Sequence, residues 1–370
     1  MKVKAAVLWE MGRDWSIEEV DLDGPGDGEV LVRYEASGLC HSDDHARTGD
    51  MPISVPTVGG HEGAGVVEEV GPGVRDLAPG DHVVGSFLPT CGRCRWCSTG
   101  RQNLCDMGAF ILAGSMADGT YRRHAQGTDL GALCMLGTFA EYGTVQQESL
   151  VKIDDDIPFD RACLVGCGVT TGWGSAVNTA KVRPGDTVVV IGCGGIGASA
   201  IQGARVAGAE HIVAVDIVES KREKILSLGA THFCTSFEEA TQLVGDMTRG
   251  VMADSAILTV GVVSGAMIGQ SLELVRKGGV GVVTGVAPAT ENTATIPLMM
   301  FTFFQKRLAG SLFGEANPRA DIPRLLNLYR NGLLQLDDIV TAEYKLDEIN
   351  QGYQDMFSGK NIRGIIQHSN

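Results

Sequence analysis

Apolar and polar residues follow two different patterns along the chain, and the change falls near residue 160. Before that point, short β-type runs alternate with Gly and Pro breaks, as in the segments 29–38, 60–74 and 79–87. Repeated Pro-Gly and Gly-Pro-Gly breaks at short intervals are typical of turns between strands. The pattern predicts that this part of the chain forms an all-β, barrel-like unit.

From about residue 160 onward, continuous apolar strands alternate with helices. We expect strands at 186–192, 211–216, 254–261 and 278–286, and helices at 198–209 and 220–229. This alternation predicts a parallel, doubly wound sheet. The strand 278–286 is expected near the end of the sheet, where a free edge favours pairing with a second copy of the chain. We therefore expect a homodimer or homotetramer. After about residue 312 the chain is predicted to be helical and polar.

Composition and charge exclude several classes of function. The chain has 370 residues, a length that suggests two domains. Its net charge of −15 argues against a nucleic-acid-binding surface. An anionic cofactor remains compatible with this charge where cations and helix N-termini converge locally. We find no secretory signal and no membrane-spanning apolar run, so we expect a cytoplasmic protein. Its ten cysteines should then be reduced or metal-bound.

A glycine motif directly follows the strand expected at 186–192. It reads Gly192-Cys193-Gly194-Gly195-Ile196-Gly197, and Asp216 comes 19 residues after its last glycine, at the end of the next strand. This context predicts a dinucleotide-binding turn, with Asp216 accepting hydrogen bonds from a ribose and favouring NAD over NADP. Lys221 either helps to hold the same ribose or is a solvated helix lysine. The alternative for the whole motif is a glycine-rich turn in an unrelated sheet.

Four cysteines lie close together in the segment 91–105. They form two C-x-x-C steps and a fourth thiol: Cys91, Cys94, Cys97 and Cys105. This spacing favours a closed tetrahedral zinc site, which would be structural because it leaves no open position. An iron–sulfur cluster also takes four thiolates, and a zinc ribbon can touch nucleic acid, although the acidic chain disfavours the latter.

Three further soft ligands are separated by 21 and then 106 residues, namely Cys40, His61 and Cys167. Two cysteines and one histidine with an open fourth position are a recognised set for catalytic zinc. Spacing alone does not unite them, and each has an ordinary explanation as a buried cysteine or a core histidine. We keep that ordinary explanation for the remaining cysteines: Cys134, Cys163, Cys193 and Cys234.

In order and spacing, these motifs together resemble those of the zinc-dependent medium-chain alcohol dehydrogenases, over nearly the whole chain. The segments that carry the resemblance are 38–43 with His45, 59–67, 91–105, 166–176, 192–197 with Asp216, and 358–364. Within that family, the segments 86–106, 111–127 and 151–158 are similar to the nicotinoprotein, or N,N-dimethyl-4-nitrosoaniline-dependent, alcohol dehydrogenases associated with mycofactocin. The resemblance implies an enzyme that transfers a hydride between a primary alcohol or aldehyde and NAD.

The resemblance also implies the fold, the domains and the cofactors. The expected architecture is α/β: a Rossmann doubly wound parallel sheet plus a mostly-β, GroES-like barrel catalytic domain. Residues 1–168 and 312–370 would form the catalytic domain, and 169–311 the dinucleotide-binding domain. Two zinc ions, one catalytic and one structural, would bind each chain. NAD would be retained through turnover and reoxidised by an external acceptor such as mycofactocin.

Roles for single residues follow from the resemblance in the same way. Cys40, His61 and Cys167 would hold the catalytic zinc, Asp43 would orient His61, and Glu62 would approach the metal during ligand exchange. Ser42 would receive the alcohol proton and pass it through a cofactor ribose hydroxyl toward His45. Phe87 would line the substrate pocket. Besides the glycine motif, Asp216 and Lys221, cofactor binding would involve His41, Thr171, Val260, Val286 and Arg363.

Two features separate this sequence from a simple match to the family. His41 stands where many relatives carry arginine, so a weaker pyrophosphate contact is expected there, because histidine is only partly charged at neutral pH. The long, loop-like segment 110–136 is the candidate for cofactor retention, for narrowing the substrate channel, or for a subunit contact. The alternatives are an ordinary NAD-exchanging alcohol dehydrogenase, an S-(hydroxymethyl)glutathione dehydrogenase, and a non-enzymatic member of the fold.

Overall fold

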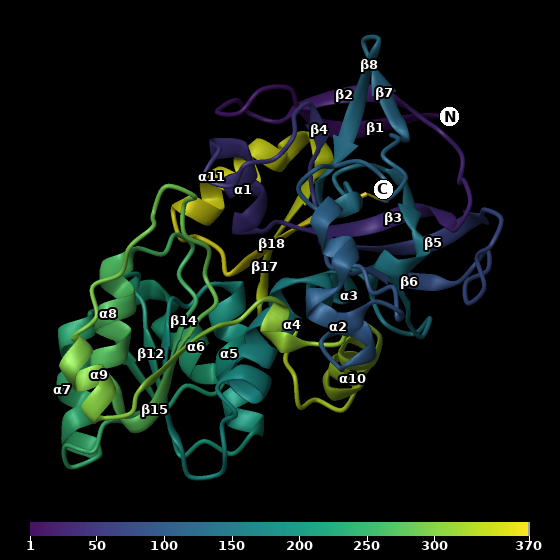
Figure 1. Ribbon diagram of the computed structural model, residues 1–370. Coiled ribbons are helices and arrows are strands. Elements are labelled where there is room, and N and C mark those ends of the chain that lie inside the picture. Colours follow the sequence, from purple (N-terminus) through teal and green to yellow (C-terminus); the bar gives the residue numbers. More distant parts are fainter. Residues whose placement is uncertain (369–370) are drawn as a thin grey trace. The chain divides into compact units, whose positions relative to one another are not determined.

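The computed structural model describes residues 1–368, which form two compact units (Figure 1). Unit 1 comprises Met1–Cys167, Asn317–Asn331 and the chain from Val340 onward, and unit 2 comprises Gly168–Ala316 and Gly332–Ile339. The expected catalytic domain included the whole of 312–370. Gly168 and the segments 312–316 and Gly332–Ile339 instead belong to unit 2, and the chain passes from one unit to the other four times.

Unit 1 contains a small closed barrel near its N-terminus. Its strands follow one another around the barrel in the order β1 (Lys2–Leu8), β2 (Ser16–Leu22), β7 (Arg123–Ala125), β8 (Thr128–Ala132) and β4 (Thr57–Val58). Side chains at alternate positions of β1 point inward and pack on apolar residues of the other strands, among them Val20, Leu22, Val58 and Leu130. The prediction of a barrel-like first part is confirmed.

A seven-stranded sheet forms the rest of the β structure of unit 1. Its order is β10 (Leu150–Lys152), β6 (His82–Gly85), β5 (Gly63–Val70), β3 (Glu29–Gly38), β18 (Arg363–Gln367) and β17 (Val340–Lys345), with β9 (Tyr142–Gln146) also paired to β3. The strand β18 runs antiparallel to β3, with Ile365 opposite Gly38. Sequence analysis predicted only helices after residue 312, and β17 and β18 correct that prediction.

Two helices of unit 1, α1 (His41–Thr48) and α11 (Ile349–Phe357), contribute to a second apolar cluster. The other α-helices of unit 1 are α2 (Arg95–Ser98), α3 (Phe159–Ala162) and α10 (Pro318–Arg330). The cluster joins the start of the chain to its end, because Trp15 and Phe139 pack in it with Ile349 and Tyr353 of α11. None of the helices within residues 1–368 combines the length and the apolar character that a bilayer crossing needs.

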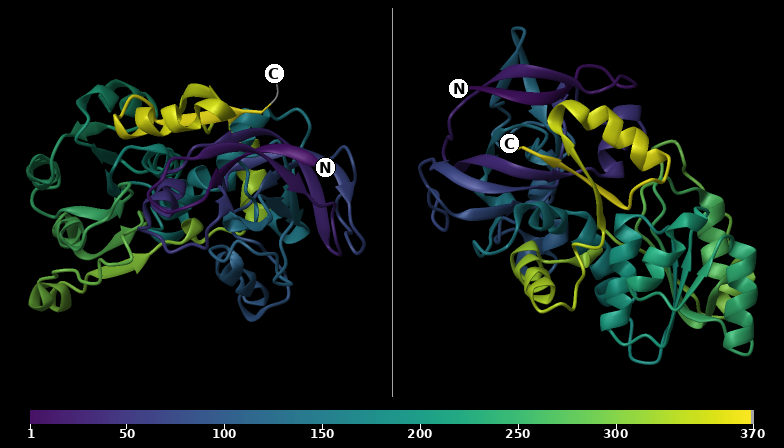
Figure 2. Two further views of the ribbon diagram at one scale, coloured as in Figure 1. Left: turned by 90° about the horizontal axis from the view of Figure 1, so that it is seen from above. Right: turned by 180° about the vertical axis from the view of Figure 1, so that it is seen from behind.

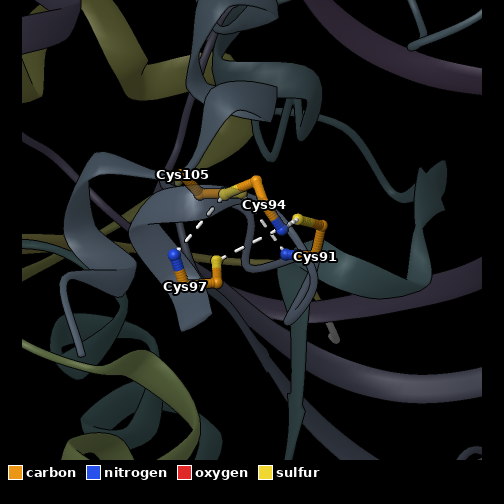
Figure 3. A group of neighbouring side chains, drawn as sticks. All are labelled: Cys91, Cys94, Cys97 and Cys105. Atoms are coloured by element: carbon orange, nitrogen blue, oxygen red, sulfur yellow. Dashed lines mark hydrogen bonds between the residues drawn. The ribbon is translucent and has the colours of Figure 1, made fainter. Parts of the chain in front are cut away.

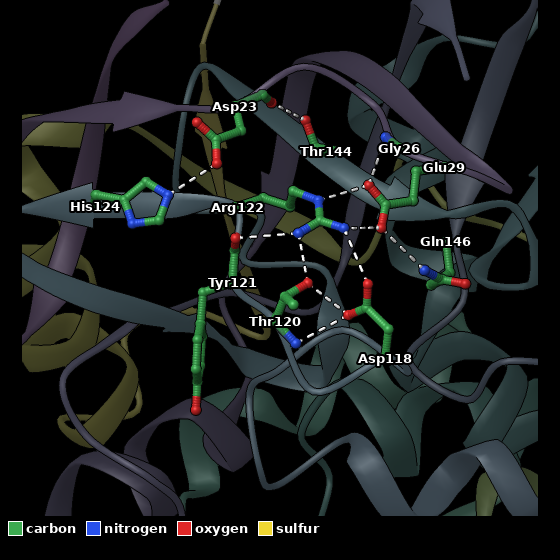
Figure 4. Close-up of polar contacts among 10 residues, drawn as sticks. All are labelled: Asp23, Gly26, Glu29, Asp118, Thr120, Tyr121, Arg122, His124, Thr144 and Gln146. Carbon is green, nitrogen blue, oxygen red and sulfur yellow. Dashed lines mark hydrogen bonds and ion pairs between the residues drawn. The ribbon is translucent and has the colours of Figure 1, made fainter. Parts of the chain in front are cut away.

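The segment 110–136 was expected to be loop-like, but the β7–β8 hairpin lies within it. The hairpin projects outward from the rest of unit 1 in Figure 1 and in the right-hand view of Figure 2. Arg122 fastens its base, because the guanidinium donates to both carboxylate oxygens of buried Glu29 at 2.7 Å (Figure 4). His124 lies between Asp23 and Asp129, with ring nitrogens 2.9 and 2.8 Å from their carboxylates.

Unit 2 is the predicted doubly wound sheet. Its six parallel strands have the order β13 (His232–Cys234), β12 (His211–Val215), β11 (Thr187–Ile191), β14 (Ala253–Leu258), β15 (Val275–Val283) and β16 (Arg307–Gly310). Strand order reverses between β11 and β14, so right-handed crossovers put α5 (Gly195–Val206) and α6 (Arg222–Ser227) on one face of the sheet. The helices α7 (Phe237–Met247) and α8 (Gly265–Glu273) lie on the other face.

The edge of this sheet differs from the expected one. Strand 278–286 was predicted near the end of the sheet, but its structural counterpart β15 pairs with both β14 and β16. The strand β16 is the edge, and α9 (Leu298–Phe303) precedes it. Sequence analysis missed β16 because its four residues carry no alternating or continuous apolar pattern.

Candidate functional site

The segment 91–105, which we call the four-cysteine lobe, brings its four thiols close together (Figure 3). The sulfur atoms of Cys91, Cys94, Cys97 and Cys105 all lie within 4.8 Å of one another. Backbone N–H groups point at these sulfurs: those of Cys91, Cys94 and Cys97 donate to Cys105, Cys91 and Cys94 at 3.4, 3.3 and 3.5 Å. The N–H of Cys97 lowers the pKa of the Cys94 thiol to about 6. Such donors stabilise thiolates, the form that binds metal.

A second group of ligand atoms lies in the interior of unit 1. Atoms of Cys40, His61, Glu62 and Cys167 are within 4.8 Å of one another, and all four residues are buried. Cys40 lies between β3 and α1, the pair His61–Glu62 directly precedes β5, and Cys167 is the last residue before α4 (Gly168–Gly174). The fold therefore brings together the three residues that spacing alone could not unite.

His61 is held by one nitrogen, and its other nitrogen has no protein partner. The Nδ1 atom of His61 lies 3.0 Å from Asp43 Oδ1, which also accepts a hydrogen bond from the backbone N–H of Gly60 at 3.0 Å. The Nε2 atom is buried without a hydrogen-bond partner. A buried, unpartnered imidazole nitrogen beside two thiols fits a metal ligand, because an orphaned polar atom is otherwise costly.

Charges within this cluster act strongly on one another. Burial is the largest single effect and opposes protonation of His61. The charges of Asp43, Cys167 and Cys40, with the hydrogen bond to Asp43, together outweigh it and raise the His61 pKa well above its ordinary value. Burial raises the pKa of Asp43. The hydrogen bond between the two thiols lowers the pKa of Cys40 and raises that of Cys167. A divalent cation would relieve this arrangement by binding the thiolates and the neutral imidazole together.

Glu62 and Arg363 form a buried ion pair beside the cluster. Their side chains are 0% and 5% exposed, and an Arg363 Nη2–Glu62 Oε2 hydrogen bond joins them. Burial, the largest single effect, would lower the pKa of Arg363, but the charges of Glu62, Cys40 and Cys167, with the hydrogen bond to Glu62, together raise it. Gly38 makes room for the pair, since a Cβ there would lie 2.2 Å from Glu62 Oε2. Arg363 was expected at a pyrophosphate, and here its guanidinium faces Glu62.

The helix α1 carries the predicted proton-transfer residues. Ser42 Oγ lies 3.7 Å from Cys40 Sγ. His45 is buried, and its Nδ1 is 3.2 Å from Asp50 Oδ2. The ring of His41 lies 5.4 Å from that of His45, and burial lowers the His41 pKa. His41 is therefore mostly neutral near pH 7, and the weak pyrophosphate contact stays a prediction.

One wall of the cluster is apolar. The ring of Phe87 lies 6.0 Å from that of His61 in an edge-to-face arrangement and packs with the same core as Ile111 and Leu112. Sequence analysis treated Cys134 as an ordinary core cysteine. Cys134 is buried, and its thiol has a pKa raised to about 12 by burial, with further effects from the charges of His61 and Asp43. This thiol is thus a neighbour of the site that no sequence motif signalled.

The glycine motif of unit 2 has the geometry of a dinucleotide turn. Gly192 has φ of +93°, and a Cβ on Gly197 would lie 1.9 Å from the Gly192 carbonyl oxygen, so both positions require glycine. Gly194 precedes α5, and a Cβ there would meet no protein atom within 4 Å. Open space before a helix N-terminus fits a pyrophosphate.

The other predicted cofactor residues of unit 2 lie near the carboxyl ends of the strands. Asp216 Oδ2 accepts hydrogen bonds from the Cys193 N–H at 2.8 Å and Lys221 Nζ at 3.0 Å. Val260 follows β14, and Val286 follows β15. Thr171 lies on α4, and its buried hydroxyl oxygen has no hydrogen-bond partner. Ligands bind at these strand ends in doubly wound folds.

Comparison with known proteins agrees with this arrangement. Residues 26–155 match the family model of the alcohol dehydrogenase GroES-like domain, and residues 195–331 match that of the zinc-binding dehydrogenases. The chain is 55% identical to an NDMA-dependent alcohol dehydrogenase of Amycolatopsis methanolica over the full length of both chains. It is 50% identical to alcohol dehydrogenase B of Mycobacterium tuberculosis strain H37Rv, covering 100% of this chain and 99% of that protein.

A solved structure shares the whole fold. The crystal structure of benzyl alcohol dehydrogenase from Acinetobacter calcoaceticus covers 99% of both chains with a TM-score of 0.92 at 32% identity. A GroES-like unit with two thiol-containing ligand clusters and a Rossmann unit define a zinc-dependent dehydrogenase. The chain belongs to the zinc-dependent alcohol dehydrogenase family, and it is an oxidoreductase of that class.

Proposed function

We propose that this enzyme oxidises primary alcohols at a zinc site formed by Cys40, His61 and Cys167, with NAD retained as a prosthetic group. The observation that carries the proposal is the buried cluster of two thiols and an imidazole whose Nε2 has no protein partner. The four-cysteine lobe is proposed to hold a second, structural zinc. Units 1 and 2 act as the catalytic and the dinucleotide-binding domain.

The chain's own residues then orient the substrate and move its proton. Bound zinc supplies a Lewis acid, and bound NAD supplies a hydride acceptor. Asp43 keeps the proton of His61 on Nδ1 and so leaves Nε2 free to bind. Ser42 Oγ is proposed to take the substrate's hydroxyl proton and to release its own proton toward His45, which lies on the same helix. Phe87 and the apolar core behind it exclude water.

Retention of NAD rests on the relative from Amycolatopsis methanolica, whose name states that it depends on NDMA. An external acceptor would then reoxidise the cofactor in place. Purified, dialysed protein should show reduced-nicotinamide absorbance stoichiometric with the chain when a primary alcohol is added, and added NAD should not restart turnover. Adding N,N-dimethyl-4-nitrosoaniline should restart it. Continuous turnover with added NAD would identify an ordinary NAD-exchanging enzyme instead. Turnover of formaldehyde only with glutathione would identify an S-(hydroxymethyl)glutathione dehydrogenase.

Assembly into a homodimer or homotetramer is supported by the free edge of unit 2. The strand β16 pairs only with β15 among the described residues, and α9 beside it exposes Leu298, Met299 and Phe303 to 74%, 63% and 75%. An open edge next to exposed apolar side chains favours pairing with a second copy. Phe303→Glu should shift the protein to monomer in light scattering, and an unchanged mass would remove α9 from the interface.

A cytoplasmic location stays a prediction. All ten cysteines are free thiols, and both candidate metal clusters need reduced thiols, which that compartment provides.

A further inference from the structure

Arg123 is a fully buried arginine without a carboxylate partner. It lies on β7 and is 1% exposed. No ion pair of Arg123 is found among residues 1–368, and its Nε atom has no hydrogen-bond partner. Burying an unpaired cation costs several kcal/mol or more. Because its burial is unfavourable, we expect Arg123 to make contacts that stabilise the fold or the site.

The contacts of Arg123 are two backbone carbonyls of one turn. Its Nη2 donates to the carbonyl oxygens of Leu136 and Gly137 at 3.1 and 3.2 Å. The hydroxyl of buried Tyr34 also donates to the Leu136 oxygen at 3.1 Å. Two glycines make the space for the guanidinium, because a Cβ on Gly137 or Gly143 would lie 2.9 or 2.6 Å from its terminal nitrogens.

This turn is strained and therefore depends on its surroundings. Cys134 and Met135 have φ of 55° and 60°, the left-handed region that disfavours residues with a Cβ, and Gly137 has φ of 56°. Each left-handed non-glycine residue costs about 1–2 kcal/mol. Such a backbone persists only where neighbouring groups over-determine it. Arg123 and Tyr34 supply hydrogen-bond donors to carbonyl oxygens of this turn, at Leu136 and Gly137.

The far end of the turn is bonded to the segment that carries His61. The backbone N–H groups of Thr138 and Phe139 donate to the carbonyls of Gly60 and Gly59 at 3.0 and 2.9 Å. The N–H of Gly60 in turn donates to Asp43 Oδ1, which accepts from His61 as well. A continuous set of hydrogen bonds thus runs from the Arg123 guanidinium to the imidazole.

We propose that Arg123 is a positioning residue for His61, acting through the turn 134–139 and the Gly59–Gly60 backbone. The proposal rests on the proposed zinc site, because it assigns Arg123 to that site's geometry. The pair of donors on the Leu136 and Gly137 carbonyls fixes the turn, and the turn fixes the two residues that precede the ligand. Residues that orient a metal ligand typically change metal affinity by about 10–100-fold when altered.

The test compares four variants of the full chain loaded with Co²⁺. The variants are Arg123→Met, Arg123→Lys, Tyr34→Phe and, as a matched control, Arg122→Met. Arg122 precedes Arg123 directly and also has a buried partner, Glu29, but it bonds neither Leu136 nor Gly137. The readouts are the visible ligand-field spectrum and the rate at which a chelator removes Co²⁺ from each site. The four-cysteine lobe serves as an internal reference within every sample.

Arg123→Met should release Co²⁺ from the Cys40–His61–Cys167 site about tenfold faster than the unaltered chain, with an altered spectrum. Arg123→Lys should lie in between, because it keeps the charge and one donor. Tyr34→Phe should shift both readouts in the same direction by a smaller factor. Arg122→Met should leave both readouts unchanged even where it lowers stability, and the lobe should be unaffected throughout.

Three outcomes would overturn the proposal. Unaltered spectra and release rates in both Arg123→Met and Tyr34→Phe would show that the turn does not position His61. An equal effect of Arg122→Met would show general loosening of the barrel. A wild-type chain that binds a single Co²⁺, in the lobe, would remove the proposed zinc site itself, which distinguishes that failure from the other two. Should Arg123→Met fail to fold, Tyr34→Phe decides by the same criteria.

Discussion

Replacing Glu62 by glutamine should destabilise unit 1 strongly, because it leaves Arg363 as a buried cation without its counterion. The two side chains are 0% and 5% exposed, so water cannot replace the lost partner. Breaking a buried pair from one side typically costs about 3–5 kcal/mol, whereas replacing both partners by neutral groups is often close to neutral. The free energy of unfolding should therefore fall by about 3–5 kcal/mol in Glu62→Gln and in Arg363→Met.

The double variant Glu62→Gln/Arg363→Met should lose much less than the sum of the two single losses. The interaction free energy from this cycle should be at least about 3 kcal/mol, which is the upper end of the usual range for residues in contact. Gly38 lets the two side chains meet, because a Cβ there would lie 2.2 Å from Glu62 Oε2. A glutamine amide at position 62 would direct an N–H donor or a weaker acceptor at the guanidinium.

Urea unfolding followed by tryptophan fluorescence measures the effect in unit 1. Three of the four tryptophans, Trp9, Trp15 and Trp96, lie in unit 1, so all chains should carry Trp173→Phe to silence unit 2. A loss of 3–5 kcal/mol shifts the midpoint by at least about 1 M urea for slopes of about 1–3 kcal/mol/M. Losses below about 1 kcal/mol in the single variants, or additive losses in the double variant, would refute the reasoning.

Three further predictions concern other contacts described above. Asp43→Asn should weaken metal binding at the Cys40–His61–Cys167 site about tenfold, with the lobe unchanged in metal analysis, because an amide oxygen holds His61 Nδ1 less strongly than a carboxylate. The hydrogen bond to Asp23 raises the pKa of His124, so the stabilisation it gives the β7–β8 hairpin is complete below the unfolded pKa of about 6.5 and is lost as pH rises through the folded value. Amide exchange in the hairpin should therefore speed up over that range, and a pH-independent difference from His124→Gln would contradict this. Ser236→Ala should cost about 1 kcal/mol, because Ser236 Oγ caps α7 by accepting from the Glu239 N–H at 3.1 Å, while Thr241→Ala on the same helix should cost less.

Local patterns were enough to predict the parts of the site that single segments build. The turn at 192–197 needs glycines for reasons that act within a few residues, namely the positive φ of Gly192 and the close approach at Gly197. The thiols of the lobe are likewise neighbours in sequence. In both cases the residues that build the feature are close in sequence, so their spacing was enough to predict that they lie close together in the structure.

Contacts between distant segments could not be read in the same way. Only the family resemblance brought Cys40, His61 and Cys167 together, because nothing in their spacing encodes how these three segments of unit 1 approach one another. The partner of Arg363 was missed, since Glu62 lies 301 positions away. The burial of Arg123 could not be predicted from the sequence. An arginine next to a second arginine and a histidine is typical of a solvent-exposed segment.

The pairing of β18 with β3 decides when unit 1 can be finished during synthesis. Residues 363–367 complete the sheet next to Cys40 and deliver Arg363 to Glu62, yet they are synthesised after every segment of unit 2. Most of unit 2, in contrast, is made well before them. The usual order, in which the N-terminal part of a chain folds first, is thus expected to be reversed here. Metal capture by the interior thiols should accordingly follow the synthesis of residues 363–367 and the pairing of β18 with β3.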